Sequence, residues 1–399
     1  MEFRVDRSDL VEAVGGAARA LPARTPVPVL GGLLLEAATD RLSVSGFDFE
    51  TAARVETDAE VAADGRVLVP GRRLLDICKV LPDGPVSCAL DGTRFTVEAG
   101  GTSFGLSTLP REEYPSPPVP PSAYGTVDAA VFASAVGQVA VAAGRDDTLP
   151  VLTGVQLRLD GEEMTLSASD RYRYAVRRLE WKPAPDATED AMEAATGTGQ
   201  AATGTGAGQA GAGAVEALLP ARRLLEVARS LARCGTVRIG LDGTSAGGRL
   251  GPVGFEGGRM RTVLRRLDGR LPAYGSLFDV AGAAVAEVEC GALAEAVRRV
   301  AVVAEANSPV RLEFASDSVL LRAGYGDDVA AQRLPAALTG AEEVTVAFNP
   351  AYLLDALASF EAARLRLELL GTGQRALLSD ADGRPDAHRH LLMSVKQLV

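Results

Sequence analysis

The chain repeats itself on the scale of a whole domain. Pro28–Gly32 (PVLGG) is matched 122 residues later by Pro150–Gly154 (PVLTG). At the same offset, Leu42–Asp48 (LSVSGFD) is matched by Met164–Asp170 (MTLSASD). Two matches at one offset indicate duplication, and a period of about 120 residues is that of a domain rather than of a solenoid repeat.

A third copy follows in the last part of the chain. Apolar residues at helical spacing begin at Leu10, Phe132 and Leu293. A second, proline-led segment also recurs three times, the last time more loosely: Pro70–Asp76, Pro220–Glu226 and Asn349–Asp355. Proline suits the first turn of a helix, where its missing N–H costs nothing.

The sequence therefore predicts an α+β chain of three similar domains, each with two helices packed on antiparallel sheet. The boundaries are expected at residues 1–121, 122–278 and 279–399. The proline-rich run Pro115–Pro121 is typical of an extended connector, and residues near Asp279–Ala284 join the second and third units.

One insertion interrupts the second repeat. The offset grows from 122 at Asp170 to 150 at Arg222, which implies roughly 28 extra residues, seen as the Gly/Ala-rich tract Pro183–Ala214. Such a tract buries too little apolar surface to order itself, so we expect a disordered surface loop. Gly206–Gly211 reads G-x-G-x-x-G, but a nucleotide-binding enzyme would need a strand before it and a helix after it.

Composition narrows the class of protein further. The chain is 47% hydrophobic and 23% charged, and no apolar run approaches the ~18 residues that span a bilayer. Its four cysteines are scattered and its two histidines, His388 and His390, lie near the C-terminus. We therefore expect a cytoplasmic protein with no cofactor, no metal site, no membrane partner and no catalytic triad.

The net charge is −11, yet basic residues gather on the expected helices, with Arg72 and Arg73 in one repeat and Arg222 and Arg223 in the next. Solvated helix faces are one interpretation. Recurrence at the same place favours the other, a shared basic surface that holds duplex DNA through phosphates and without reading its sequence.

From Met1 to about Val395 the chain resembles the bacterial DNA polymerase III β subunit, the sliding clamp. The resemblance rests on several motifs: Arg24 with Pro28–Gly31, Asp76–Pro82, Phe104–Pro110 with Tyr114-Pro115, Ser169–Arg173, Phe348–Leu354, and Leu391–Met393. It implies a head-to-tail homodimeric ring around double-stranded DNA, with helices lining the bore. The ring would tether the replicative polymerase α subunit for processive DNA replication, without catalysis, after a clamp loader closes it on nucleoid DNA.

The resemblance also assigns residues. The candidates for phosphate contact are Arg24, Arg72, Arg73, Arg145, Arg222 and Arg223. The dimer interface would contain Leu75, Cys78, Phe104 and Leu106 of one subunit against Ala301 and Val302 of the next. Clamp-binding peptides of partner proteins would enter a pocket lined by Leu152, Ser169, Arg171, Tyr172, Arg173, Tyr174, Pro272, Leu277, Asn349, Tyr352, Leu392, Met393, Ser394 and Val395.

Departures from the family pattern cluster at that pocket. Tyr174 stands where the family usually has Leu, and Ser394 stands where it has Pro. We expect Tyr174 to narrow the apolar slot and Ser394 to loosen the C-terminal wall. An open alternative is therefore a specialised second copy of the clamp, whose altered pocket gives tolerance to a clamp-directed antibiotic.

Overall fold

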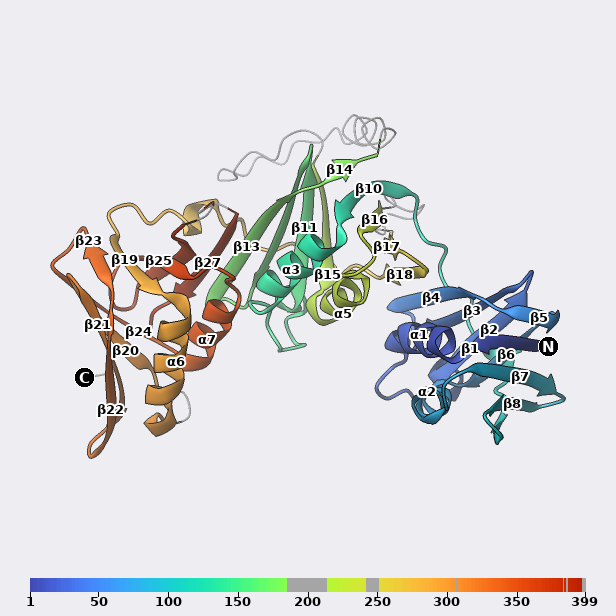
Figure 1. Cartoon of the computed structure of the whole chain (residues 1–399). Helices are drawn as coiled ribbons and strands as arrows, with labels where there is room; N and C mark the ends of the chain where they lie inside the picture. The colour runs from blue at the N-terminus through green and yellow to red at the C-terminus, as the bar shows by residue number, and fades with distance from the viewer. Residues whose placement is uncertain (185–213, 242–250, 306–307, 383, 385–386, 397–399) are drawn as a thin grey trace. The chain divides into compact units, whose positions relative to one another are not determined.

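The computed structural model describes residues 1–184, 214–241, 251–305, 308–382, 384 and 387–396. Within these ranges the helices are α1 (Arg7–Ala17), α2 (Gly71–Val80), α3 (Ala129–Ala140), α5 (Ala221–Leu231), α6 (Cys290–Val300) and α7 (Pro350–Ala358) (Figure 1). The strands form four sheets in which every pair is antiparallel. The expected α+β class is confirmed.

The described residues pack into two compact units. Those of the first unit lie within Met1–Ala130, Lys182–Ala187 and Glu226–Arg266. One of its sheets has the order β5 (Glu60–Ala63), β1 (Glu2–Asp6), β7 (Pro85–Asp91), β8 (Arg94–Ala99), β9 (Thr102–Ser107). The other has the order β14 (Lys182–Pro183), β10 (Ala123–Asp128), β16 (Thr236–Leu241), β17 (Val253–Gly257), β18 (Met260–Leu264), β4 (Thr51–Asp58), β3 (Arg41–Phe47), β2 (Gly32–Ala38), β6 (Gly65–Pro70).

The second unit also contains two sheets. The larger has the order β15 (Val215–Pro220), β11 (Gly154–Asp160), β12 (Glu163–Ser169), β13 (Arg173–Glu180), β27 (His388–Met393), β26 (Arg375–Asp380), β25 (Arg364–Leu369), β19 (Ala284–Glu289), β23 (Ala337–Thr339). The smaller has the order β22 (Asp328–Pro335), β21 (Ser318–Tyr325), β20 (Val310–Ala315), β24 (Glu343–Phe348).

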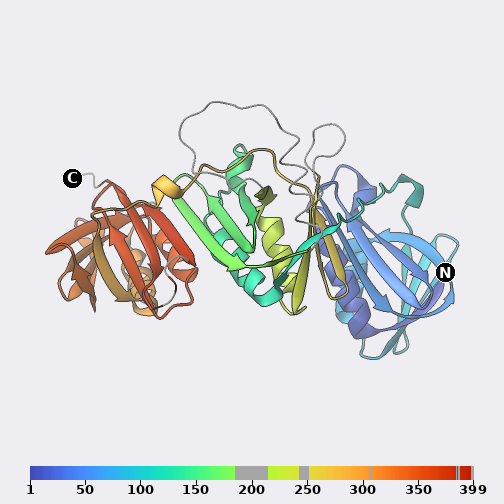
Figure 2. The same cartoon turned by 90° about the horizontal axis from the view of Figure 1, so that it is seen from above.

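Strand pairing joins neighbouring repeats. β4 of the first repeat pairs with β18 of the second, and β13 of the second pairs with β27 of the third. Figure 2, seen from above, shows the green β13 alongside the red β27. The strands of the middle repeat are therefore divided between two continuous nine-stranded sheets.

The expected helices bury the predicted faces. Leu10, Ala13, Val14 and Ala17 of α1 are fully buried, as are their counterparts in α6. Both helices start after an acidic cap: Asp6 accepts the Ser8 N–H, and Glu289 accepts the Gly291 N–H. Each is also followed by a short 3₁₀ turn, Ala18–Ala20 and Ala301–Val303 respectively. α1 packs beside α2, and α6 beside α7 (Figure 1).

The repeated turns are the same in detail. The Oδ1 atom of Asp48 accepts hydrogen bonds from the backbone N–H groups of Glu50 and Thr51. In the same way, the Oδ1 atom of Asp170 accepts hydrogen bonds from the backbone N–H groups of Tyr172 and Arg173. In both turns the intervening residue has a positive φ, 71° at Phe49 and 82° at Arg171.

Most of the inserted tract, including Gly206–Gly211, lies outside the described residues. Its first residue does not match the expectation of a loop, because Pro183 lies in β14 and pairs with Gly125. The Ala184 N–H then donates to the carbonyl of Tyr124. At Pro183 the expectation of a loop is therefore wrong, and the expectation for residues 185–213 lies outside the described residues.

The two histidines lie in β27, and both are buried. His388 Nδ1 lies 3.1 Å from the Val176 carbonyl of β13, and its Nε2 lies 2.9 Å from Ser359 Oγ. Burial lowers the pKa of His388 to about 4, with the nearby Arg177 charge acting in the same direction. Burial also lowers the pKa of His390 far below its ordinary value.

These shifts predict acid sensitivity. Unfolded histidine titrates near 6.5, so between about pH 6.5 and 4 the unfolded chain binds more protons than the folded one. Stability should therefore fall as the pH drops through this window, by on the order of 2–3 kcal/mol for His388 at pH 4. His388→Gln should flatten the pH dependence of the urea midpoint, and parallel curves for both proteins would contradict this explanation.

Candidate partner-binding groove

A groove of about 410 Å³ lies in the second unit, between the β12–β13 turn and the first turns of α7. Five of the predicted pocket residues line it: Leu152, Arg171, Tyr172, Arg173 and Tyr352. Its other lining residues are Ala143, Gly144, Arg145, Asp146, Leu149, Asp170, Ala351 and Asp355. The structure thus brings together one part of the predicted pocket.

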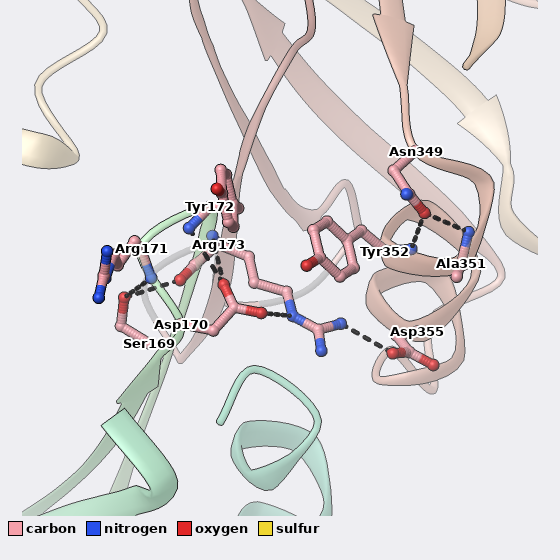
Figure 3. A network of polar contacts seen from close by, with 9 residues as sticks. All are labelled: Ser169, Asp170, Arg171, Tyr172, Arg173, Asn349, Ala351, Tyr352 and Asp355. Carbon is pink, nitrogen blue, oxygen red and sulfur yellow. Dashed lines mark hydrogen bonds and ion pairs between the residues drawn. The ribbon is translucent and has the colours of Figure 1, made fainter. Parts of the chain in front are cut away.

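The guanidinium of Arg173 holds this groove together (Figure 3). Its Nε donates to Asp170 Oδ2 at 2.8 Å, and its Nη1 donates to Asp355 Oδ2 at 2.7 Å. The guanidinium also stacks 4.4 Å from the ring centre of Tyr352. Because Arg173 is 5% exposed and Asp170 10%, their ion pair is less screened than a surface pair, whereas Asp355 is 40% exposed and its pair with Arg173 is partly hydrated. The two pairs join the β12–β13 turn to α7.

The exposed ring of Tyr172 and the half-buried ring of Tyr352 lie beside the ion pairs of Arg173. Tyr172 stacks on Tyr352, with ring centres 6.1 Å apart. The start of α7 is fixed by Asn349, whose Oδ1 accepts the N–H groups of Ala351 and Tyr352. Burial raises the pKa of Tyr352, so its hydroxyl stays neutral at physiological pH. The groove thus combines aromatic faces with fixed charges, as partner and ligand sites often do.

Tyr174 and Leu277, both predicted for the apolar part of the pocket, lie in one aromatic cluster. Tyr174 is 3% exposed, and its ring packs against those of Tyr274 and Phe278, with centres 5.7 and 5.9 Å away. Its hydroxyl donates to the carbonyl of Pro272 at 3.0 Å. The same cluster includes Leu277, whose carbonyl accepts a hydrogen bond from Arg375.

Ser394 is tied to the neighbouring backbone by hydrogen bonds, and the expectation that it loosens the C-terminal wall relative to Pro stays a prediction. Ser394 is buried, and its hydroxyl lies within hydrogen-bond distance of the Gly371 and Gln374 carbonyls. Its own N–H donates to Gln374, and the Val395 N–H donates to Ala347. The neighbours of Ser394 differ in exposure, with Leu392 in the core and Met393 38% exposed. Of the remaining predicted residues, Ser169 is buried and its hydroxyl donates to the Arg173 carbonyl.

Sequence reasoning missed the two acidic partners of Arg173. A signal for both exists in the repeats, since Asp170 corresponds to Asp48 and Asp355 corresponds to Asp76 and Glu226. This signal did not identify the two aspartates as partners of Arg173, because a repeated position in the sequence does not show which residue its side chain contacts. The ion pairs depend on the approach of α7 to the β12–β13 turn, which no local pattern encodes.

The residues predicted to contact DNA are divided between the two units. In the first unit Arg24, Arg72 and Arg73 are exposed, and Arg72 donates to the carbonyls of Pro22 and Ala23. In the second unit Arg222 is exposed and Arg223 is half-buried on α5, while Arg145 lines the groove. Arg72 thus fixes the loop that presents Arg24.

The predicted interface residues differ in exposure. Val302 is 81% exposed, and Ala301, Leu75 and Phe104 are partly buried. Cys78 and Leu106 lie in the core of the first unit, so they can only support an interface from beneath. β9 and β22 are each at the edge of a sheet.

Three protein-family models of the DNA polymerase III beta subunit match this chain. The model of the N-terminal domain matches residues 1–118, that of the central domain residues 126–193, and that of the C-terminal domain residues 276–394. The beta sliding clamp of Streptomyces coelicolor is 45% identical over 405 residues, covering 99% of each chain. The chain belongs to this family. The resemblance seen in the sequence is confirmed, and with it the assignment of the chain as a sliding clamp, a DNA replication processivity factor.

Two further comparisons bear on this sliding clamp family. A Streptomyces muensis protein named beta sliding clamp homolog GriR is 40% identical over 401 residues, with 99% of each chain covered. The fold is shared with a Pseudomonas aeruginosa clamp bound to griselimycin, at a TM-score of 0.85, 24% identity and full coverage of both chains.

Two observations concern other kinds of site. Among the residues that the structure describes, there is no group of three or more His, Cys, Asp or Glu side chains that could hold a metal ion. In the same part of the chain, none of the helices has the length and apolar character needed to cross a membrane.

Proposed function

We propose that this sliding clamp works as a closed homodimeric ring, which retains double-stranded DNA by topology and performs no chemical step. The observation that carries the proposal is the full-length match to beta sliding clamps, together with the threefold repeat. Partners, including the clamp loader and the replicative polymerase, would be held by peptides near the Arg173 groove. Tethering raises their effective concentration at DNA without requiring tight binding to it.

Ring closure needs two different surfaces that complement each other head to tail. The edge strands β9 and β22 offer unpaired backbone groups, and Val302 offers a large exposed apolar side chain. Both features support an interface between the first repeat of one subunit and the third repeat of the next.

Val302→Asp should therefore give monomers, because a carboxylate would be buried without a partner in the interface. Val119 is a matched control, since it is 83% exposed and lies in the proline-rich connector. Light scattering at micromolar concentration should report a dimer for Val119→Asp and a monomer for Val302→Asp. Dimers of both variants would show that Val302 lies outside the interface.

DNA contact is proposed for the exposed arginines around α2. Arg24 and Arg73 are exposed, and the contacts of Arg72 with the 22–23 carbonyls keep Arg24 beside them. Phosphate contacts of this kind fix position without specifying sequence.

Reversing charge at Arg24 and Arg73 should lower loading on primed circular DNA, because each lost phosphate contact weakens salt-dependent attraction. Arg24→Glu and Arg73→Glu are each compared singly with Arg4→Glu, at an exposed position on β1, so that the net charge of the variants is the same. Retention on circles and loss from linear DNA should persist in every variant that still loads. Sequence-dependent binding to short linear duplexes would contradict the clamp mechanism.

A specialised second copy with an altered pocket is the other candidate, and the burial of Tyr174 favours it. Any Leu or Phe side chain entering the apolar slot must displace the Tyr174–Tyr274–Phe278 cluster and the hydrogen bond to Pro272. The Streptomyces muensis protein is named as a homolog of the beta sliding clamp, GriR, and it is 40% identical to this chain over 401 residues. This similarity fits a subgroup of clamps that is separate from the replicative one.

Tyr174→Leu should open the slot and strengthen binding of a Leu/Phe-bearing clamp peptide, or of griselimycin, by roughly 5- to 150-fold, the equivalent of about 1–3 kcal/mol of steric misfit. Tyr174→Phe keeps the ring but loses the Pro272 hydrogen bond, so it should change affinity much less. Calorimetric titration of the three proteins distinguishes these cases. Equal affinities throughout would mean that Tyr174 does not restrict the site.

A further inference from the structure

Arg171 occupies a backbone conformation that its side chain does not favour. Its φ of 82° lies in the left-handed region, where a residue with a Cβ is strained. The turn imposes this conformation, because the Asp170 carboxylate accepts the N–H groups of Tyr172 and Arg173. Ser169 Oγ accepts the N–H of Arg171 itself.

The equivalent turn of the first repeat shows that the fold does not need an arginine here. Phe49 takes the same position there, with a φ of 71° between the N–H groups bound by Asp48. Two unrelated side chains therefore accept the same strain. The identity of Arg171 must be explained by what its guanidinium does outside the turn.

The Arg171 guanidinium stands on the rim of the groove. Figure 3 shows it directed away from the network of Arg173, Asp170 and Asp355. Arg145 is also exposed and lines the same groove. Neither arginine forms an ion pair within 4.0 Å with any residue that the structure describes.

The carboxylates of the groove are already engaged. Asp170 and Asp355 are both bound by the buried Arg173. Asp146 accepts hydrogen bonds from the N–H and hydroxyl of Thr148, and its pKa is lowered mainly by them and to a smaller extent by Arg171. The six charged side chains that line the groove balance overall, three arginines against three aspartates. At the rim itself Asp146 offsets only one of the two charges of Arg145 and Arg171, so the positive charge is local to that rim.

We propose that Arg145 and Arg171 make this groove selective for partner peptides that carry a carboxylate beside their apolar anchor. The inference rests on the proposed peptide site and adds the class of ligand that it prefers. Closure of the apolar slot by Tyr174 increases the importance of this charged rim, since less of the binding can come from apolar burial. An exposed charge pair contributes modestly and weakens with salt.

The test uses fluorescein-labelled peptides that end in a Leu-Phe pair. The reference peptide has Gln at each of the three positions before this pair, and each of three variants has Glu at one of these positions. At least one Glu peptide should bind the whole protein about three- to tenfold more tightly than the all-Gln peptide at low salt. The preference should shrink at 0.5 M NaCl. Arg171→Gly should abolish most of it, and Arg4→Gln, which removes an exposed charge of the first unit, should leave it intact.

Each outcome separates the proposals. Because glycine favours a positive φ, Arg171→Gly should unfold at the same or a higher temperature, and a lower midpoint would show that Arg171 supports the fold instead. Equal binding of Glu and Gln peptides would overturn the charge selectivity and leave the peptide site standing. All titrations are repeated with Tyr174→Leu, where the apolar slot is open. Binding of no peptide even there would overturn the peptide site and this inference with it.

Discussion

The buried guanidinium of Arg173 is the contact on which the candidate site depends. It neutralises one carboxylate from the β12–β13 turn and one from α7, and it supports the ring of Tyr352. Removing it would leave the 10% exposed carboxylate of Asp170 without its cation, which is costlier than losing an exposed pair, and would free the half-exposed carboxylate of Asp355 from its contact with the turn. The same strand, β13, also pairs with β27, so backbone pairing and ion pairing act together to hold the second and third repeats at this groove.

The groove and the adjacent aromatic cluster have opposite characters. Tyr174, Tyr274 and Phe278 fill their space with the chain's own apolar surface, and burial raises the pKa of Tyr174 to about 12, so it remains an uncharged donor to Pro272. The rim near Arg171 remains open and charged. Recognition at such a site shifts from burial of an apolar side chain towards electrostatic attraction, which changes association rate and salt dependence more than affinity.

Local patterns in the sequence were sufficient for the repeating elements. The apolar spacing from Leu10 and from Leu293 predicted α1 and α6, and the segments at Leu42 and Met164 predicted matching strands. Contacts between distant segments were not encoded in this way. The pairing of β13 with β27, the acidic partners of Arg173 and the enclosure of Tyr174 all depend on how repeats approach one another. The resemblance identified Tyr174 as unusual, but only the packing of its ring against Tyr274 and Phe278, with its hydroxyl bound to the Pro272 carbonyl, explains its burial.

The repeat also explains why chemistry differs between equivalent positions. The Asp48 and Asp170 turns use the same hydrogen bonds and the same positive φ, yet one presents a phenylalanine and the other an arginine. The backbone strain is a property of the turn, whereas the side chain it displays is free to change without altering the fold. Duplicated turns therefore let the chain vary a surface at one repeat while the framework of both turns is kept. At Arg171 the displayed side chain adds a positive charge to the edge of the groove, on a chain whose net charge is −11.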